Sequence, residues 1–137
     1  MKVLLDTNIV LDLLLGRKPF DSLAQEIFIQ IEQKKIEGFL APTSITTIYY
    51  LLNRQLDKKT SNDAIKTLLE MFKITKLDKE VLINSLENNG IDFEDSVIYT
   101  SGAFSDIDII ITRDKKGFKN SKIDVLSPSE FLKKRDK

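Results

Sequence analysis

The stretch KVLLD, Lys2 to Asp6, decides the fold because an apolar run ends there abruptly at an acidic side chain. A short run of this kind is typical of a buried strand. The next segment, Ile9 to Leu15, is apolar apart from Asp12 and ends at Gly16, which indicates a helix. The chain therefore begins with a strand, an acid and a helix.

Farther along the chain, short apolar runs alternate with longer segments of helical spacing. Strands are expected at 39–40, 73–76, 107–112 and 122–126. A helix is expected over 23–31, closed by Gly38, and another begins at Pro42. Ser61 is the expected N-cap of the helix after that, and the next two run from Asp78 to Leu86 and from Asp92 to about Phe104, with a break between them at Asn88-Asn89-Gly90. The capping box Ser127-Pro128-Ser129-Glu130 opens the last helix. This alternation predicts an α/β fold: a three-layer sandwich with a central, mostly parallel sheet of about four or five short strands flanked by helices, in a single domain over residues 1–137.

Length and composition indicate an ordinary globular protein. The 137 residues are 42% hydrophobic and 31% charged, which suits one domain with its own core. The apolar start of the chain differs from a signal peptide, because Asp6 and Asp12 interrupt it and no small-residue cleavage site follows. No apolar run approaches the roughly 18 residues of a membrane span. We therefore expect a cytoplasmic protein that does not enter the membrane.

The chain contains no cysteine and no histidine. Disulfides, thiol catalysis and Ser–His pairs are thereby excluded, and zinc loses its usual ligands. A metal ion would be held by oxygen atoms, which favours Mg²⁺ or Mn²⁺. The 21 basic and 21 acidic residues balance, so binding of nucleic acid would depend on a local basic patch rather than on overall charge.

Acidic side chains collect at one edge of the predicted sheet. Ligands of such folds bind at the carboxyl ends of the strands, and Asp6 and Asp114 each follow a predicted strand. Asp92, Glu94 and Asp95 open the helix before the second of these strands, so its first turn lies at the same edge. Clustered carboxylates repel one another, and a divalent cation relieves that repulsion. The alternative is structural, because acids at a helix start cap the helix and stabilise it through its dipole.

Three stretches, read in order, resemble the PIN domain family: DTN at 6–8, DFEDS at 92–96 and ITRDKKGF at 111–118. With the closing SPSEFL at 127–132, they are most similar to small prokaryotic VapC-type toxins. The resemblance implies an endoribonuclease that needs Mg²⁺ or Mn²⁺ and hydrolyses single-stranded or structured RNA. The implied catalytic and metal-binding residues are Asp6, Asp95 and Asp114, and Asp92 is a candidate for a further metal ligand. The expected supporting residues are Thr7, Asn8, Ser44, Thr47, Glu94 and Thr112. A local basic patch supplies the charge that the neutral chain lacks, and its candidates for contact with RNA phosphates are Arg113, Lys115, Lys116 and Lys119.

The sequence departs from the family in the helix that begins at Pro42. The family commonly has an acid near Thr47, but no acid occurs from residue 38 to residue 56. Three explanations are open. Asp92 or Glu94 substitutes for the acid, or the site binds metal more weakly, or the chain is an inactive module that binds RNA or a protein partner through its acidic rim.

Two rival enzyme classes also place an aspartate after the first strand. A phosphatase of the haloacid dehalogenase type needs a second acid two residues later, where this chain has Asn8. A receiver-like phosphoacceptor domain usually shows paired acids, whereas a single acid follows the first strand here. Both classes are disfavoured. A further departure from the PIN family is Gly117, where related sequences often have another aspartate.

The resemblance also implies protein partners. A small antitoxin would occupy the acidic rim and insert an Arg or Lys among the carboxylates. We also expect a homodimer, for which Tyr49, Tyr50 and Leu51 are candidate contacts. The alternative is that Tyr49 and Leu52 belong to the core.

Overall fold

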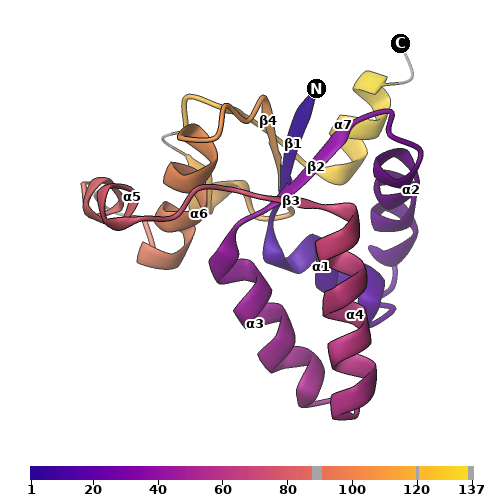
Figure 1. The fold of residues 1–137 in the computed structure, drawn as a ribbon. Coiled ribbons are helices and arrows are strands. Elements are labelled where there is room, and N and C mark those ends of the chain that lie inside the picture. Colours follow the sequence, from indigo (N-terminus) through magenta and orange to yellow (C-terminus); the bar gives the residue numbers. More distant parts are fainter. Residues whose placement is uncertain (88–90, 120, 136–137) are drawn as a thin grey trace.

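The computed structural model describes residues 1–87, 91–119 and 121–135. Five parallel strands form one sheet in the order β3-β2-β1-β4-β5 (Figure 1). The strands are β1 (Lys2–Leu5), β2 (Glu37–Leu40), β3 (Lys73–Ile74), β4 (Ile109–Ile111) and β5 (Asp124–Leu126), and the helices are α1 (Thr7–Leu14), α2 (Asp21–Glu32), α3 (Pro42–Asn53), α4 (Lys58–Met71), α5 (Lys79–Ser85), α6 (Phe93–Ala103), the short 3₁₀ helix η1 (Lys115–Phe118) and α7 (Pro128–Arg135).

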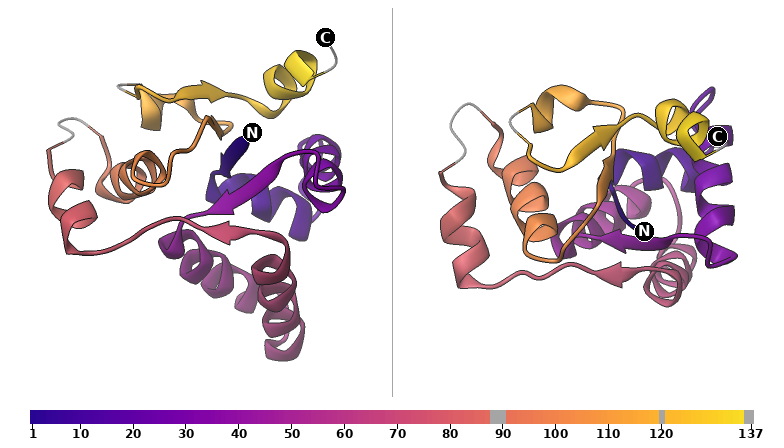
Figure 2. Two further views of the ribbon diagram at one scale, coloured as in Figure 1. Left: turned by 45° about the horizontal axis from the view of Figure 1, so that its top comes forward. Right: turned by 90° about the horizontal axis from the view of Figure 1, so that it is seen from above.

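The residues of β1 pack alternately into two separate hydrophobic clusters. Val3 and Leu5 belong to a cluster built with side chains of α1, α2, α3, α4 and α7. Leu4 points to the opposite face, where it joins Ile98 of α6, because successive side chains of a strand alternate between faces. Figure 2 shows helices on both sides of the sheet. The predicted three-layer α/β fold with a parallel central sheet is confirmed.

The expected helix end at Gly38 is wrong. Helix α2 ends at Glu32, and Gly38 lies inside β2. A Cβ atom on Gly38 would stand 2.7 Å from Cδ1 of Ile31 and 2.8 Å from Cδ1 of Phe72. Glycine is needed there because two helical segments pack directly over the strand, which is a tertiary requirement rather than a helix stop.

The expected N-cap at Ser61 is also wrong. Helix α4 begins at Lys58, and the Asp57 carboxylate caps it by accepting a 2.7 Å hydrogen bond from the backbone N–H of Thr60. Ser61 is buried inside the first turns of the helix. Both Asp and Ser are good N-caps. A cap at Asp57 starts the helix one turn earlier than a cap at Ser61, so the helix gains additional backbone hydrogen bonds.

The remaining differences concern element ends. Strands β3, β4 and β5 are each shorter than expected, and β2 begins two residues earlier. The capping box before α7 is confirmed, since Ser127 and Glu130 exchange hydrogen bonds of 2.9 and 3.1 Å. The expected break at 88–90 lies outside the described residues. In the described part of the chain, no helix has the length and apolar character needed to cross a membrane.

Candidate active site

Four of the five acids predicted to converge line one cavity at the carboxyl edge of the sheet. Its volume is about 250 Å³. The lining residues are Asp6, Thr7, Asn8, Thr47, Leu51, Glu94, Asp95, Ile98 and Asp114. Strand ends and helix starts meet at this edge, so four carboxylates from three distant stretches of sequence face one space.

Asp6 is held from both sides. Its Oδ1 accepts a 2.8 Å hydrogen bond from the backbone N–H of Thr7, which caps α1, and its Oδ2 accepts a 2.8 Å hydrogen bond from the Thr112 hydroxyl. The same hydroxyl oxygen accepts a 3.0 Å hydrogen bond from the backbone N–H of Asp114. Buried Thr112 therefore links Asp6 to the turn that carries Asp114. Burial raises the pKa of Asp6, although these hydrogen bonds oppose the rise.

Asp95 occupies the first turn of α6 and has the most perturbed carboxyl group of the site. Burial, followed by the negative charges of neighbours led by Asp6, raises its pKa from 3.8 to about 6. Gly117 in η1 packs directly against it, because a Cβ there would lie 2.6 Å from Asp95 Oδ2. The carboxylate is thus enclosed by like charges on one side and by backbone on another.

The fourth carboxylate comes from Glu94 and contacts α3. Its Oε1 accepts a 3.3 Å hydrogen bond from the hydroxyl of Thr47, the position where the family would have an acid. Asp92 is the N-cap residue of α6, but its side chain makes no capping hydrogen bond, and it does not line the cavity.

Two predicted supporting hydroxyls are connected to each other. Thr7 donates a 2.9 Å hydrogen bond from its hydroxyl to the Ser44 hydroxyl oxygen, and Ser44 is fully buried. Ser44 therefore contacts the site through Thr7 and does not line the cavity itself. Asn8 does line it, from the first turn of α1.

The predicted RNA-contacting cations are not gathered around the acids. Arg113 turns to Asp12 of α1, with Nε–Oδ2 and Nη2–Oδ1 distances of 2.7 and 3.0 Å. Lys115 pairs with Glu130, and this contact, with hydrogen bonds from Ser127, lowers the pKa of Glu130 to about 2.

The other two lysines of the predicted patch, Lys116 and Lys119, are exposed and do not line the cavity. Sequence reasoning missed the pairing partner of Arg113. Asp12 is an acid inside an apolar helix, and this was the available signal that a cation would pair with it.

The donor chemistry of the cavity suits a hard divalent cation. Its carboxylate, hydroxyl and amide oxygens are ligands that Mg²⁺ and Mn²⁺ prefer. The raised pKa of Asp95 reflects burial first and then crowded negative charge, which a cation would neutralise. With the side chains as they stand, no three acids of the described residues are arranged to hold one ion. Binding by Asp6, Asp95 and Asp114 therefore requires side-chain rotation.

Fold and cavity together define an α/β protein with a cluster of four carboxylates at the carboxyl edge of its parallel sheet. Residues 2–116 match the family model described as PIN domain, and the chain belongs to that family. The predicted resemblance is thereby confirmed.

Known proteins agree with this assignment. The chain is 28% identical to Ribonuclease VapC1 of Aquifex aeolicus (strain VF5), over 97% of this chain and 94% of that protein. Two solved structures share its fold. The toxin-antitoxin complex from Klebsiella pneumoniae has a TM-score of 0.70 at 19% identity, over 92% of this chain and 97% of that one. VapBC2 from Rickettsia felis, bound to a promoter DNA fragment, has a TM-score of 0.69 at 18% identity, over 93% and 98%.

Proposed function

We propose that this protein is a divalent-metal-dependent endoribonuclease and the toxin of a toxin–antitoxin pair. The observation that carries the proposal is the convergence of Asp6, Asp95 and Asp114 on one cavity of a PIN domain. The similarity to a protein named as a ribonuclease supports RNA as the substrate.

The chain's own residues would prepare the site for Mg²⁺ or Mn²⁺. Asp6, Asp95 and Asp114 would hold the metal, which when bound supplies an activated water and neutralises charge on the phosphodiester. Thr112 keeps Asp6 and the Asp114 turn in register. A proton would compete with the metal for Asp95 below about pH 6, because burial and neighbouring charges raise its pKa to about 6.

We assign the role of the missing α3 acid to Glu94. Glu94 lines the cavity and contacts Thr47, whereas Asp92 does not line the cavity. A carboxylate from the first turn of α6 would thus replace the one that the family commonly places on α3. Of the explanations left open by the sequence, substitution by Glu94 is the one that the contacts support.

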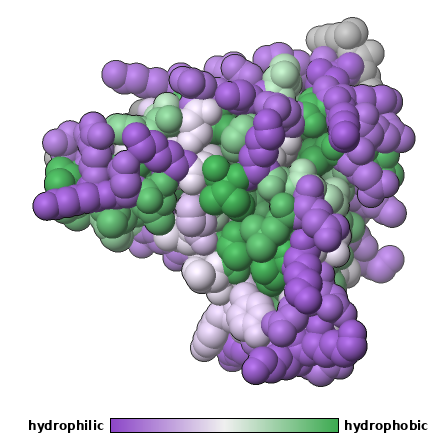
Figure 3. Space-filling view, viewed as in Figure 1, coloured by the Kyte–Doolittle hydropathy of each residue, from purple (hydrophilic) through white to green (hydrophobic). Residues whose placement is uncertain are grey.

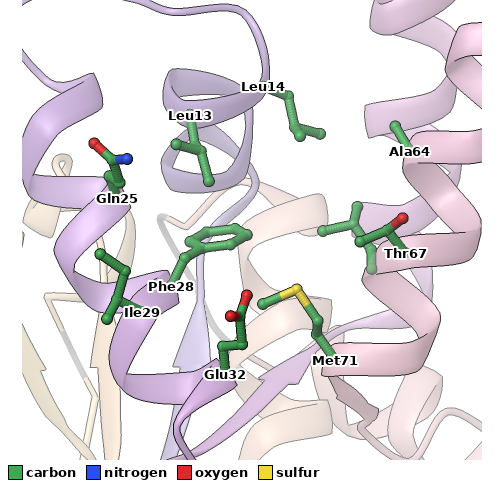
Figure 4. Close-up of a pocket in the computed structure, with 10 residues that line it drawn as sticks. Leu13, Leu14, Gln25, Phe28, Ile29, Glu32, Ala64, Thr67 and Met71 are labelled. Atoms are coloured by element: carbon green, nitrogen blue, oxygen red, sulfur yellow. The ribbon is translucent and has the colours of Figure 1, made fainter.

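An apolar groove between α1, α2 and α4 supports the antitoxin part of the proposal (Figure 4). Its volume is about 380 Å³. Its apolar lining comes from Leu13, Leu14, Phe28, Ile29, Ala64, Leu68 and Met71. An amphipathic helix docks into a groove of this kind through its apolar face, and a solved structure of similar fold is a toxin-antitoxin complex.

The groove and the acidic cavity lie close enough for one antitoxin to reach both. Asn8 lines the cavity and Leu13 lines the groove, and five residues of α1 rise by about 8 Å. A partner seated in the groove could therefore place an Arg or Lys among the carboxylates. Ile29→Lys should abolish co-purification with the product of a neighbouring gene while RNA cleavage persists. Leu69→Lys, an exposed position of α4 outside the groove, is the control, and equal loss in both variants would contradict the docking site.

The predicted homodimer has a candidate surface on and after α5. Leu82, Ile83 and Leu86 are exposed there, and Figure 3 shows apolar side chains at the surface of this helix, at the left of the view. Of the residues named from the sequence, Leu52 is buried and Tyr50 is exposed. Light scattering should report a dimer for the wild type and a monomer for Ile83→Lys; a wild-type monomer would contradict the dimer.

A second candidate function is an inactive module that binds RNA or a protein through its acidic rim. The observation in its favour is that the described acids are not yet arranged around one ion. Such a module would bind its partner equally well in the presence of EDTA, whereas the nuclease would lose cleavage.

The test of the proposed function is cleavage of single-stranded and structured RNA with Mn²⁺ or Mg²⁺. The wild type should cut, EDTA should stop it, and Asp95→Asn should reduce cleavage at least a hundredfold. Asp124→Asn is the matched control, because Asp124 is exposed on β5 outside the acidic cavity. Cleavage that survives in Asp95→Asn would overturn the assignment.

A further inference from the structure

A second cavity adjoins the acidic one at the carboxyl edge of the sheet. Its volume is about 370 Å³, and it is lined by Phe20, Leu23, Arg113, Ser127, Pro128 and Ser129. Arg113 and Ser127 each follow closely on the end of a strand, β4 and β5. Arg113 also directly precedes Asp114, which lines the acidic cavity, and consecutive Cα atoms are about 3.8 Å apart. The two cavities therefore lie on either side of one turn.

The guanidinium group in the second cavity is fixed in orientation. Two hydrogen bonds tie Arg113 to the carboxylate of Asp12, which is only 1% exposed. The guanidinium carbon lies 3.9 Å from the centroid of the Phe20 ring. Arg113 and Phe20 thus form a pair of planar groups held in place from α1 and from the start of α2.

This planar pair is accessible. The side chain of Arg113 is 30% exposed and Phe20 is 39% exposed. Unpaired nucleobases stack on aromatic rings and guanidinium planes. Nε and Nη2 of Arg113 already donate hydrogen bonds to Asp12, which leaves fewer donor groups for a phosphate, and Leu23 and Pro128 add apolar walls. The cavity therefore suits a base better than a backbone phosphate.

We propose that this second cavity is a nucleobase subsite. It takes the base of an unpaired nucleotide next to the phosphodiester that lies at the acidic cavity, and Phe20 with Arg113 forms the stacking surface. The subsite rests on the proposed ribonuclease function and extends it, because it requires the nucleotide beside the cleaved bond to be unpaired. Asp12 is a positioning residue for the subsite, acting through Arg113.

The chain contains no tryptophan, so a single introduced indole reports on this surface alone. The experiment uses Phe20→Trp in an Asp95→Asn background, which is not expected to cut, and adds a single-stranded RNA decamer. The control is Phe104→Trp in the same background. Phe104 is 38% exposed and lies 5.8 Å from the ammonium group of Lys76, so it matches Phe20 in exposure and in having a cation neighbour.

RNA should quench the fluorescence of the Phe20→Trp protein and leave that of the Phe104→Trp protein unchanged. In the otherwise wild-type enzyme, Phe20→Leu should raise KM for RNA about tenfold, which equals about 1.4 kcal/mol, with kcat nearly unchanged. Phe104→Leu should change neither. The KM measurement keeps the test decisive if the tryptophan variant does not fold.

Failure of the subsite can be distinguished from failure of the proposed ribonuclease function. Labelled RNA that binds, as shown by anisotropy, without selective quenching or a KM change would overturn the subsite and leave the nuclease intact. RNA that neither binds nor is cut by the wild type would overturn the proposed function and the subsite together.

Discussion

The Thr47 hydroxyl on α3 donates a 3.3 Å hydrogen bond to the Glu94 carboxylate on α6. Both residues line the acidic cavity, so the contact joins the helix that lacks an acid to the helix that supplies one. The pair therefore accounts for a site that keeps four carboxylates without an acid on α3.

The first prediction concerns the replacement of the α3 acid by Glu94 of α6. Glu94→Gln should weaken Mn²⁺ binding about tenfold in calorimetry, because a neutral amide replaces one of the carboxylates around the ion. Asp92→Asn should change it less than twofold, since Asp92 does not line the cavity. The double variant Thr47→Glu/Glu94→Gln should regain most of the affinity. Equal effects of the two single variants would show that Glu94 has no special place.

Gly117 provides the second prediction. In Gly117→Ala the new methyl carbon would meet Asp95 Oδ2 at 2.6 Å, so the carboxylate must move aside. The free energy of unfolding should change by less than about 1 kcal/mol, because the end of a flexible side chain gives way. Mn²⁺ affinity should fall severalfold. Unchanged affinity would mean that Asp95 does not need the space beside Gly117 to hold the ion.

The third prediction is a pH dependence. The pKa of Asp95 is raised from 3.8 to about 6 in the folded protein, so between these values the folded state keeps a proton that the unfolded state has released. The contribution of Asp95 to the free energy of unfolding of the metal-free protein should therefore fall as pH rises from about 4 to about 6. Burial raises the pKa of Asp6 in the same direction.

Urea unfolding from pH 4 to pH 7 measures this effect. Asp95→Asn should flatten the decline, and Mn²⁺ at pH 7 should restore stability to the wild type. Metal affinity should weaken below about pH 6, where protons compete with the ion. A difference in the free energy of unfolding between the wild type and Asp95→Asn that stays constant over this range would contradict the raised pKa.

The fourth prediction concerns the buried ion pair. Asp12→Ala should lower the free energy of unfolding by on the order of 2 kcal/mol, below the roughly 3–5 kcal/mol of a fully buried pair because Arg113 is partly exposed. The double variant Asp12→Ala/Arg113→Met should recover part of the loss, since the guanidinium group that Asp12→Ala leaves unpaired is removed; Arg17, whose Nη1 lies 3.9 Å from Asp12 Oδ1, remains. Urea denaturation gives both values, and additive losses would show that the two residues are uncoupled.

Much of the fold and of the acid cluster could be predicted from the sequence. Parallel strands bring their carboxyl ends to one edge, so Asp6 after β1 and Asp114 after β4 had to meet there. A helix preceding such a strand begins at that edge, which placed Asp95 with them. The positions of these three acids follow from the direction of each strand and helix, and the order of the elements along the sequence already determines that direction.

What the sequence could not predict depends on tertiary packing. The ion pair of Arg113 could not be foreseen, because its partner Asp12 lies 101 residues away and only the fold brings them together. Gly38 was expected to end a helix, because local rules cannot show that Ile31 and Phe72 pack over it. The sequence left open whether Asp92 or Glu94 replaces the acid missing from α3. The contact between Glu94 and Thr47 favours Glu94, and that contact joins two different helices.

The central claim is that Asp6, Asp95 and Asp114 form one carboxylate metal site, and calorimetric titration with Mn²⁺ tests it most directly. The wild type and the Asp124→Asn control should bind Mn²⁺ saturably, and Asp95→Asn should show no saturable heat at millimolar metal. A wild type that fails to bind, or an Asp95→Asn protein that binds as tightly as the wild type, would contradict the account.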